Sequence, residues 1–116
     1  MMARMNSIRI SIFFLYGDHL AGVEQLYEID FSTGIDLPPF GKGIDLVGDG
    51  SLWAISTKGH CKGHLIFFIN GIEDKVLVTG DAGNTQYQFD SQIGPGYFSS
   101  DLEKAQDVLD QIIAFK

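Results

Sequence analysis

The chain has little of the chemistry that would cross-link it or carry it into a membrane. Of its 116 residues only Cys61 is a cysteine, so no disulfide can form within the chain, and this usage fits a reducing cytoplasm best. No apolar run approaches the roughly 20 residues that a membrane-spanning helix needs. The apolar stretch after Arg9 has no small-residue cleavage site behind it, so it predicts a core strand and not a signal peptide. We therefore expect a cytoplasmic protein that does not contact a membrane.

Positive charge is scarce as well. Eight lysines and arginines stand against 15 aspartates and glutamates, which gives a formal net charge of -7. The basic residues are scattered singly, whereas nucleic-acid binding requires a cluster or stripe of them. The sequence therefore predicts no nucleic-acid partner.

Core-forming residues, by contrast, are plentiful. Hydrophobic residues make up 45% of the chain, and no segment combines low hydrophobicity with high charge in the way that prevents folding. A chain of this length suits one domain that buries roughly two thirds of the surface exposed in its unfolded form. Because no repeat or linker divides the sequence, we expect a single domain over residues 1–116.

Several segments have the pattern of β-strands. Residues 8–15 alternate isoleucine with polar residues and then become wholly apolar, which predicts a half-buried strand. Glycine and proline are frequent between residues 30 and 50, so only residues 44–47 predict a strand there, and GDG (48–50) predicts a hairpin turn. Three further strand-like runs are SLWAIST (51–57), HLIFFIN (64–70) and KVLVTG (75–80), the last two joined by the turn GIED.

Helical periodicity follows the first predicted strand. Apolar residues recur at helical spacing from Leu20 to Tyr27, and Asp18 is placed to cap this helix at its N-terminus. The pattern predicts a short helix that ends near Glu28.

A second helix is predicted near the C-terminus. Ser100 and Glu103 have the spacing of a capping box, and residues 102–113 form one apolar face. The segment NTQYQFDSQIGPGYF (84–98) before it predicts a loop, whose aromatic residues could line the mouth of a pocket. Together these elements predict an α/β protein of the α+β type, a layered sandwich in which two helices cover a mixed sheet of about five strands.

His60 and Asp81 are the residues on which metal chemistry would depend. His60 lies in KGHCKG, where the glycines imply a turn after the strand of residues 51–57, and Asp81 follows the apolar strand of VLVTGD. Neighbouring strands would bring an imidazole and a carboxylate to one rim, and zinc and iron accept both ligand types. The alternative is that Asp81 caps a turn and His60 makes one hydrogen bond. Spacing alone leaves both interpretations open.

The segment DLVGDGSLWAISTKGHCKGHLIFFINGIEDKVLVTGDAG, from Asp45 to Gly83, resembles metallo-β-lactamase-fold hydrolases, in particular their lactonase-like branch. The family stretch is approximately D-L-F-G-D-G-S-L-W, then P-G-H-T-P-G-H, then V-L-L-T-G-D-A. The resemblance implies that His60 binds one metal and that Asp81 bridges two. His64 matches a second histidine that is usually structural in the family.

The family's motif H-x-H-x-D-H is half preserved. The corresponding segment, FLYGDHLAGV, keeps Asp18 and His19 but has Phe14 and Tyr16 where two histidines belong. By resemblance, Asp18 would also be the catalytic residue that orients the nucleophile and shuttles its proton. The metal would be zinc or another divalent cation, and the implied ligands are His60, Asp81, Asp18 and His19.

Two functions are compatible with this resemblance. The first is a metal-dependent hydrolase of a lactone or ester, with activity weakened or lost because part of the ligand shell is missing. The second is a non-catalytic remnant that serves as an interaction or binding module. The chain corresponds to the later half of the family fold, a truncated metallo-β-lactamase-like sandwich, so sheet edges and an apolar face should stay exposed. We therefore expect a homo-oligomer, such as a homodimer.

Overall fold

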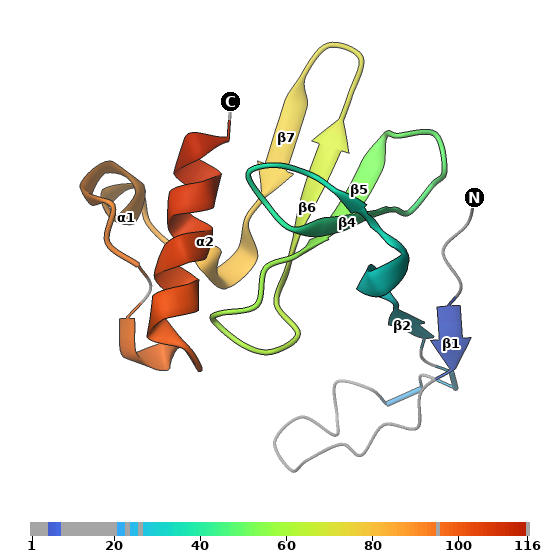
Figure 1. The fold of residues 1–116 in the computed structure, drawn as a ribbon, viewed down its shortest axis with the longest axis horizontal. Coiled ribbons are helices and arrows are strands. Elements are labelled where there is room, and N and C mark those ends of the chain that lie inside the picture. Colours follow the sequence, from blue (N-terminus) through green and yellow to red (C-terminus); the bar gives the residue numbers. More distant parts are fainter. Residues whose placement is uncertain (1–4, 8–20, 23, 26, 95, 116) are drawn as a thin grey trace.

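The computed structural model of the chain describes residues 5–7, 21–22, 24–25, 27–94 and 96–115. The strand predicted over residues 8–15 lies outside the described residues, and so do Asp18 and His19. The described part contains a five-stranded sheet, a two-stranded sheet and two α-helices (Figure 1).

The five-stranded sheet is built in the order of the sequence. Neighbouring strands are paired antiparallel throughout, where a mixed sheet was expected. The predicted α+β fold, with about five strands and two helices, is confirmed, and GIED forms the turn between the last two strands. The strands are β3 (Ile35–Asp36), β4 (Lys42–Asp45), β5 (Leu52–Ser56), β6 (Leu65–Asn70) and β7 (Lys75–Val78).

Asp45 organises the predicted turn between β4 and β5. Its carboxylate accepts hydrogen bonds from the backbone N–H groups of Val47, Gly48 and Gly50, at 3.2, 2.9 and 2.8 Å. Gly48 and Gly50 both have positive φ angles, of 93° and 80°, which glycine adopts without steric cost. The hairpin turn predicted at GDG is confirmed.

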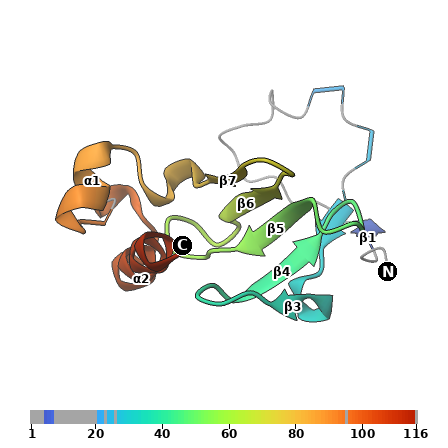
Figure 2. The ribbon, with the colours of Figure 1, turned by 90° about the horizontal axis from the view of Figure 1, so that it is seen from above.

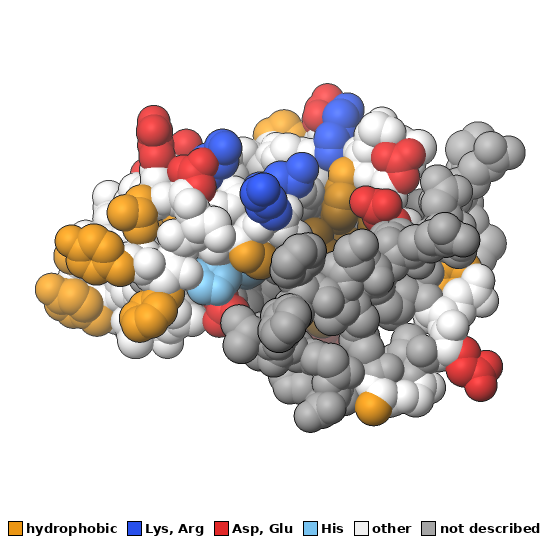
Figure 3. Space-filling view, turned by 90° about the horizontal axis from the view of Figure 1, so that it is seen from below, with side chains coloured by type: hydrophobic (Ala, Val, Ile, Leu, Met, Phe, Trp, Pro, Cys, Tyr) orange, Lys and Arg blue, Asp and Glu red, His pale blue; other side chains and the backbone are white. Residues whose placement is uncertain are grey.

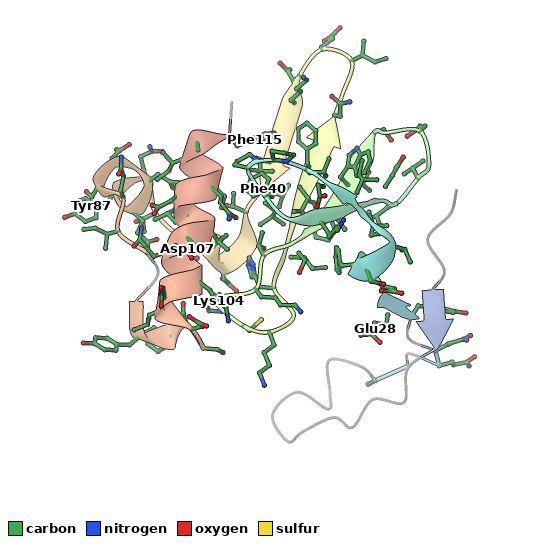
Figure 4. The ribbon with its side chains drawn as sticks, viewed as in Figure 1. Glu28, Phe40, Tyr87, Lys104, Asp107 and Phe115 are labelled. Atoms are coloured by element: carbon green, nitrogen blue, oxygen red, sulfur yellow. The ribbon has the colours of Figure 1, made fainter. Side chains whose placement is uncertain are left out.

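The core lies between one face of the sheet and the helix α2 (Leu102–Ala114), which runs beside the sheet in Figure 2. Ile55 and Ile66 are opposite each other on β5 and β6, and both are buried against Val108 of α2. Phe115, at the end of this helix, packs on Phe40 with ring centroids 5.4 Å apart (Figure 4). Burial of these apolar side chains is the main stabilisation of the layer between helix and sheet.

The N-terminus of α2 is capped by a residue other than the one predicted. Asp101, and not Ser100, is the N-cap, and its carboxylate accepts a hydrogen bond from the N–H of Lys104 at 3.1 Å. The backbone N–H of Ser100 donates instead to the carbonyl of His60. The predicted capping box is therefore wrong by one residue, because the chain before the helix is tied to the β5–β6 loop.

The helix predicted to end near Glu28 is not formed by the described part of that segment. Tyr27–Ile29 is a strand, β2, paired antiparallel with β1 (Met5–Ser7). Gly22 has a φ of 84°, in the left-handed region that a right-handed helix does not contain. The helical spacing of apolar residues was misleading, because pairing with a strand from elsewhere in the chain outweighs weak local propensity.

A helix also occurs where a loop was predicted. The helix α1 (Gln86–Ser91) is capped by Thr85, whose side chain accepts from the N–H of Gln88 while the Gln88 side chain accepts from the N–H of Thr85. The prediction of a loop is therefore wrong for Gln86–Ser91, where the Thr85–Gln88 capping box starts a helix.

In the described part of the chain, no helix is long and apolar enough to cross a membrane.

Candidate functional site

The two candidate ligands in the described part lie together at one end of the sheet, where β5 and β7 both end. His60 belongs to the loop between β5 and β6, and Asp81 to η3 (Gly80–Ala82), the turn that follows β7. The strands β5 and β7 both pair antiparallel with β6, so their C-terminal ends lie at the same end of the sheet. His60 Nε2 lies 3.6 Å from Asp81 Oδ2, with the two side chains 25% and 66% exposed. The structure therefore brings together the imidazole and carboxylate that the sequence singled out.

The position of His60 is fixed by its backbone. The carbonyl of His60 accepts from the N–H of Ser100 at 2.8 Å, and the carbonyl of Gly59 accepts from the N–H of Asp101 at 3.1 Å. Gly59 also lies so close to α2 that a Cβ atom there would be 2.7 Å from the backbone nitrogen of Ala105. Only glycine allows this approach, and the N-terminus of α2 thus holds the loop that carries His60.

His64 is buried next to His60. Its side chain is 8% exposed, its Nδ1 lies 2.9 Å from the Thr57 hydroxyl, and its ring is 5.9 Å from the ring of His60. Burial and, to a smaller extent, repulsion from His60 lower the pKa of His64, although a hydrogen bond with the Thr57 backbone and the charge of Asp81 raise it. At neutral pH the ring is neutral. Thr57 was not singled out from the sequence, because a contact across seven residues of loop has no local pattern.

The His60–Asp81 spacing fits a shared metal ion. A zinc ion bonded to a nitrogen and an oxygen at about 2.1 Å, in tetrahedral geometry, holds these two atoms about 3.4 Å apart. The observed 3.6 Å is close to that value and is long for a direct hydrogen bond. The donor types also suit zinc, iron or manganese.

The described residues supply only part of a metal site. Among them, no group of three or more His, Cys, Asp or Glu side chains is arranged to hold a metal ion. Asp18 and His19, the other implied ligands, lie outside the described residues. His60 Nδ1 is buried with no hydrogen-bond partner in the described part, whereas a metal-binding histidine normally donates its second N–H to an oxygen. Among the described residues, the candidate pair therefore has neither further ligands nor a hydrogen-bond partner that orients the His60 ring.

Aromatic side chains are exposed on the segment between η3 and α2. Tyr97 and Phe98 of η4 (Gly96–Phe98) and Tyr87 of α1 are exposed, and apolar side chains gather on the same side of the space-filling view as a surface imidazole (Figure 3). The ring of Phe89 instead lies against Gly83, where a Cβ would be 2.5 Å from it. The exposed aromatics make this segment an apolar part of the surface.

Comparison with known proteins identifies no family for this chain. The chain matches no protein-family model, no curated protein and no solved structure. The resemblance to metallo-β-lactamase-fold hydrolases therefore stays a prediction from the sequence.

Proposed function

We propose that the chain binds a divalent metal, zinc in the first instance, through His60 and Asp81, and that it is a metal-dependent hydrolase of low activity. The observation that supports this most directly is the 3.6 Å approach of His60 Nε2 to Asp81 Oδ2 at the end of the sheet where β5 and β7 both end. The resemblance of residues 45–83 to metallo-β-lactamase-fold hydrolases gives a lactone or ester as the substrate class. The single free cysteine, Cys61, is exposed and suits a reducing cytoplasm, where we place the protein.

In this proposal, some of the four residues would bind the metal and one would also transfer a proton. A bound zinc ion lowers the pKa of its water to about 7 and polarises a carbonyl group. His60 and Asp81 hold the ion, and Asp18 and His19 are the remaining proposed ligands. Asp18 orients the attacking water and takes up its proton. Low activity follows from Phe14 and Tyr16, which stand where the family has two histidines, and from the Nδ1 of His60, which has no hydrogen-bond partner among the described residues.

Metal analysis of two variants tests this proposal. Wild-type protein purified without chelator is expected to contain zinc, iron or manganese, and His60→Ala and Asp81→Asn should each reduce zinc affinity at least tenfold, because each removes one ligand. Asp74→Asn is the matched control, since Asp74 is an exposed carboxylate in the β6–β7 turn, at the other end of β7 from Asp81. Its zinc affinity should equal that of wild type. Competition with a chromogenic chelator measures all three.

The outcomes separate metal binding from catalysis. Wild-type protein that holds none of these metals, or variants that bind zinc as tightly as wild type, would refute the proposed site. Zinc binding without hydrolysis of simple lactones or of p-nitrophenyl acetate would refute the hydrolase alone. Circular dichroism of each variant excludes unfolding as the cause of lost metal.

A second candidate function is a non-catalytic, self-associating module. Val76 and Val78 of β7 and Ile69 of β6 are exposed, and the register places them on the sheet face opposite Leu77 and Phe68, which pack on the core. An exposed apolar face at a sheet edge favours pairing with a second copy. The two functions are compatible, because this face and the His60–Asp81 pair involve different residues.

A further inference from the structure

A cleft of about 680 Å³ lies between two segments that are distant in the sequence. One wall comes from β2 and η2 (Phe31–Thr33), and the other from the β5–β6 loop and the strand ends beside it, both in the lower half of Figure 1. Small-molecule sites in proteins typically enclose about 300 to 1,000 Å³. Neither His60 nor Asp81 is among the described residues that line the cleft, so it is separate from the candidate metal pair.

The loop wall of the cleft is positively charged. Lys58 and Lys62 both line it, and both are exposed. The ion pairs of the described residues are Lys42–Asp36, Lys104–Asp101 and His60–Asp81, so neither lysine of the cleft has a carboxylate partner among them. Two ammonium groups on one wall favour the anionic group of a ligand.

The opposite wall is negatively charged. Its carboxylates are those of Glu28 on β2, which is labelled in Figure 4, and of Asp30, which caps η2. Asp30 accepts hydrogen bonds from the Ser32 hydroxyl at 2.6 Å and from the Ser32 N–H at 3.0 Å, and these bonds lower the pKa of the Asp30 carboxyl. Asp30 stays ionised, and both of these bonds go to its Oδ1, so Glu28 is the carboxylate of this wall that accepts no hydrogen bond from the other described side chains.

Both walls of the cleft also carry apolar side chains. Ile29, Phe31 and Leu65 are half-buried and line the same cleft. A ligand that covered them would remove their apolar surface from water, which is favourable by about 25 cal/mol per Å². The cleft therefore combines a positive wall, a negative wall and an apolar lining.

We propose that this cleft binds a small zwitterionic molecule with an apolar body, such as an apolar amino acid or a short peptide. Its carboxylate pairs with Lys58 and Lys62, its ammonium group pairs with Glu28, and its apolar part covers Phe31 and Leu65. An anion without an ammonium group would leave Glu28 facing it, and a cation without a carboxylate would face the lysines, so both are disfavoured. A free amino acid and a dipeptide share this chemistry and differ in the distance between their charges.

Titration of the full chain with paired probes tests the charge requirement. The probes are L-leucine and L-leucyl-L-leucine, with N-acetyl-leucine lacking the ammonium group and leucinamide lacking the carboxylate. Calorimetry or NMR should show saturable binding of at least one zwitterion and severalfold weaker binding of both neutralised analogues. Failure of both zwitterions to saturate overturns the proposal, and the probe that binds distinguishes an amino acid from a peptide.

Variants of the two walls locate the binding. The double variant Lys58→Ala, Lys62→Ala should weaken zwitterion binding about two- to tenfold, the effect of losing two exposed ion pairs, while the binding of the cation leucinamide should strengthen because the repulsion by the lysines is removed. Glu28→Gln should weaken zwitterion binding without weakening that of N-acetyl-leucine. Lys75→Ala and Glu73→Gln, on the distant β6–β7 hairpin, are the matched controls.

Equal effects in the cleft variants and in the hairpin controls overturn the assignment to this cleft. Zinc affinity should stay at the wild-type value in all these variants, because none of them changes His60 or Asp81. Failure of this proposal is thereby distinguishable from failure of the metal site.

Discussion

At the scale of single residues, His64 shows how burial sets the chemistry of a side chain. Its imidazole is enclosed beside Gly80, where a Cβ would lie 3.3 Å from Nε2, and its Nδ1 is engaged with the Thr57 hydroxyl. Removal of the ring from water disfavours its charged form, and this effect, together with repulsion from His60, outweighs a hydrogen bond with the Thr57 backbone and the charge of Asp81. The folded protein therefore holds His64 neutral at a pH where the unfolded chain would begin to protonate it.

This difference predicts that the protein becomes less stable as the pH falls through 6.5 and below. The pKa of His64 is lowered in the folded state from an ordinary value of 6.5, so the unfolded state takes up a proton first as the pH falls. The contribution of neutral His64 to stability is present above pH 6.5 and is lost as the pH falls through the folded-state pKa. Urea denaturation at several pH values measures the free energy of unfolding.

The matched variant is His64→Gln, which should show a shallower pH dependence over the same range. Carboxyl groups whose pKa values are lowered by hydrogen bonds, such as Asp30, Asp49 and Asp101, titrate below their ordinary value of 3.8 and do not contribute in this window. An identical pH dependence in wild type and variant would contradict the prediction.

Single residues also show what the sequence could and could not predict about the site. His60 and Asp81 were identifiable because each follows an apolar strand, and antiparallel pairing then brings the two strand ends to one end of the sheet. The Thr57–His64 contact was not identifiable, because it depends on the path of the loop. The Lys58–Lys62 wall was also overlooked, since its opposite wall lies about 30 residues earlier in the chain and no local pattern connects them.

At the scale of elements, the β5–β6 loop depends on its close approach to α2. Gly59→Ala should destabilise the protein by about 1–3 kcal/mol, because the new Cβ would lie 2.7 and 2.8 Å from backbone atoms of Ala105 and the loop or helix must move. Zinc affinity should fall with it, since the same movement displaces His60. Thermal unfolding and chelator competition measure the two effects.

Gly63→Ala is the control within the same loop. A Cβ at Gly63 has nothing within 4 Å, and its φ is not in the left-handed region, so alanine should leave stability and zinc affinity close to wild type. Comparable losses in both variants would mean that the loop is sensitive to any side chain and that contact with α2 does not position His60.

The elements also differ in how far the sequence determines them. The strands β5, β6 and β7 were predicted because each has a continuous apolar pattern and a clear turn between it and the next. The strand β4 begins two residues earlier than predicted, at Lys42. It ends at Asp45, because the Asp45 side chain accepts hydrogen bonds from backbone N–H groups of the turn that follows. The strand β2 was missed because its short segment is defined by its partner β1 and not by its own pattern.

At the scale of the whole molecule, α2 covers one face of the sheet, and the opposite face is buried at Ile44 and Ala54 but exposed along β6 and β7. The covered face carries Ile55, Ile66 and Phe68 against α2. The other face carries the exposed cross-strand pair Ile69 and Val76 and, further along β7, Val78. An α+β protein that leaves such a face open at the edge strand β7 has a ready surface for a second copy.

Self-association through this face is the prediction for the assembled molecule. Wild-type protein should sediment as a dimer or larger species at about 100 µM, and Val78→Lys should shift it toward the monomer, because a buried ammonium group without a partner strongly disfavours an apolar interface. Val47→Lys is the matched control, since Val47 is an exposed valine in the β4–β5 turn and away from this face. A wild type that stays monomeric at this concentration, or a control that dissociates the protein as far as Val78→Lys does, would contradict the interface.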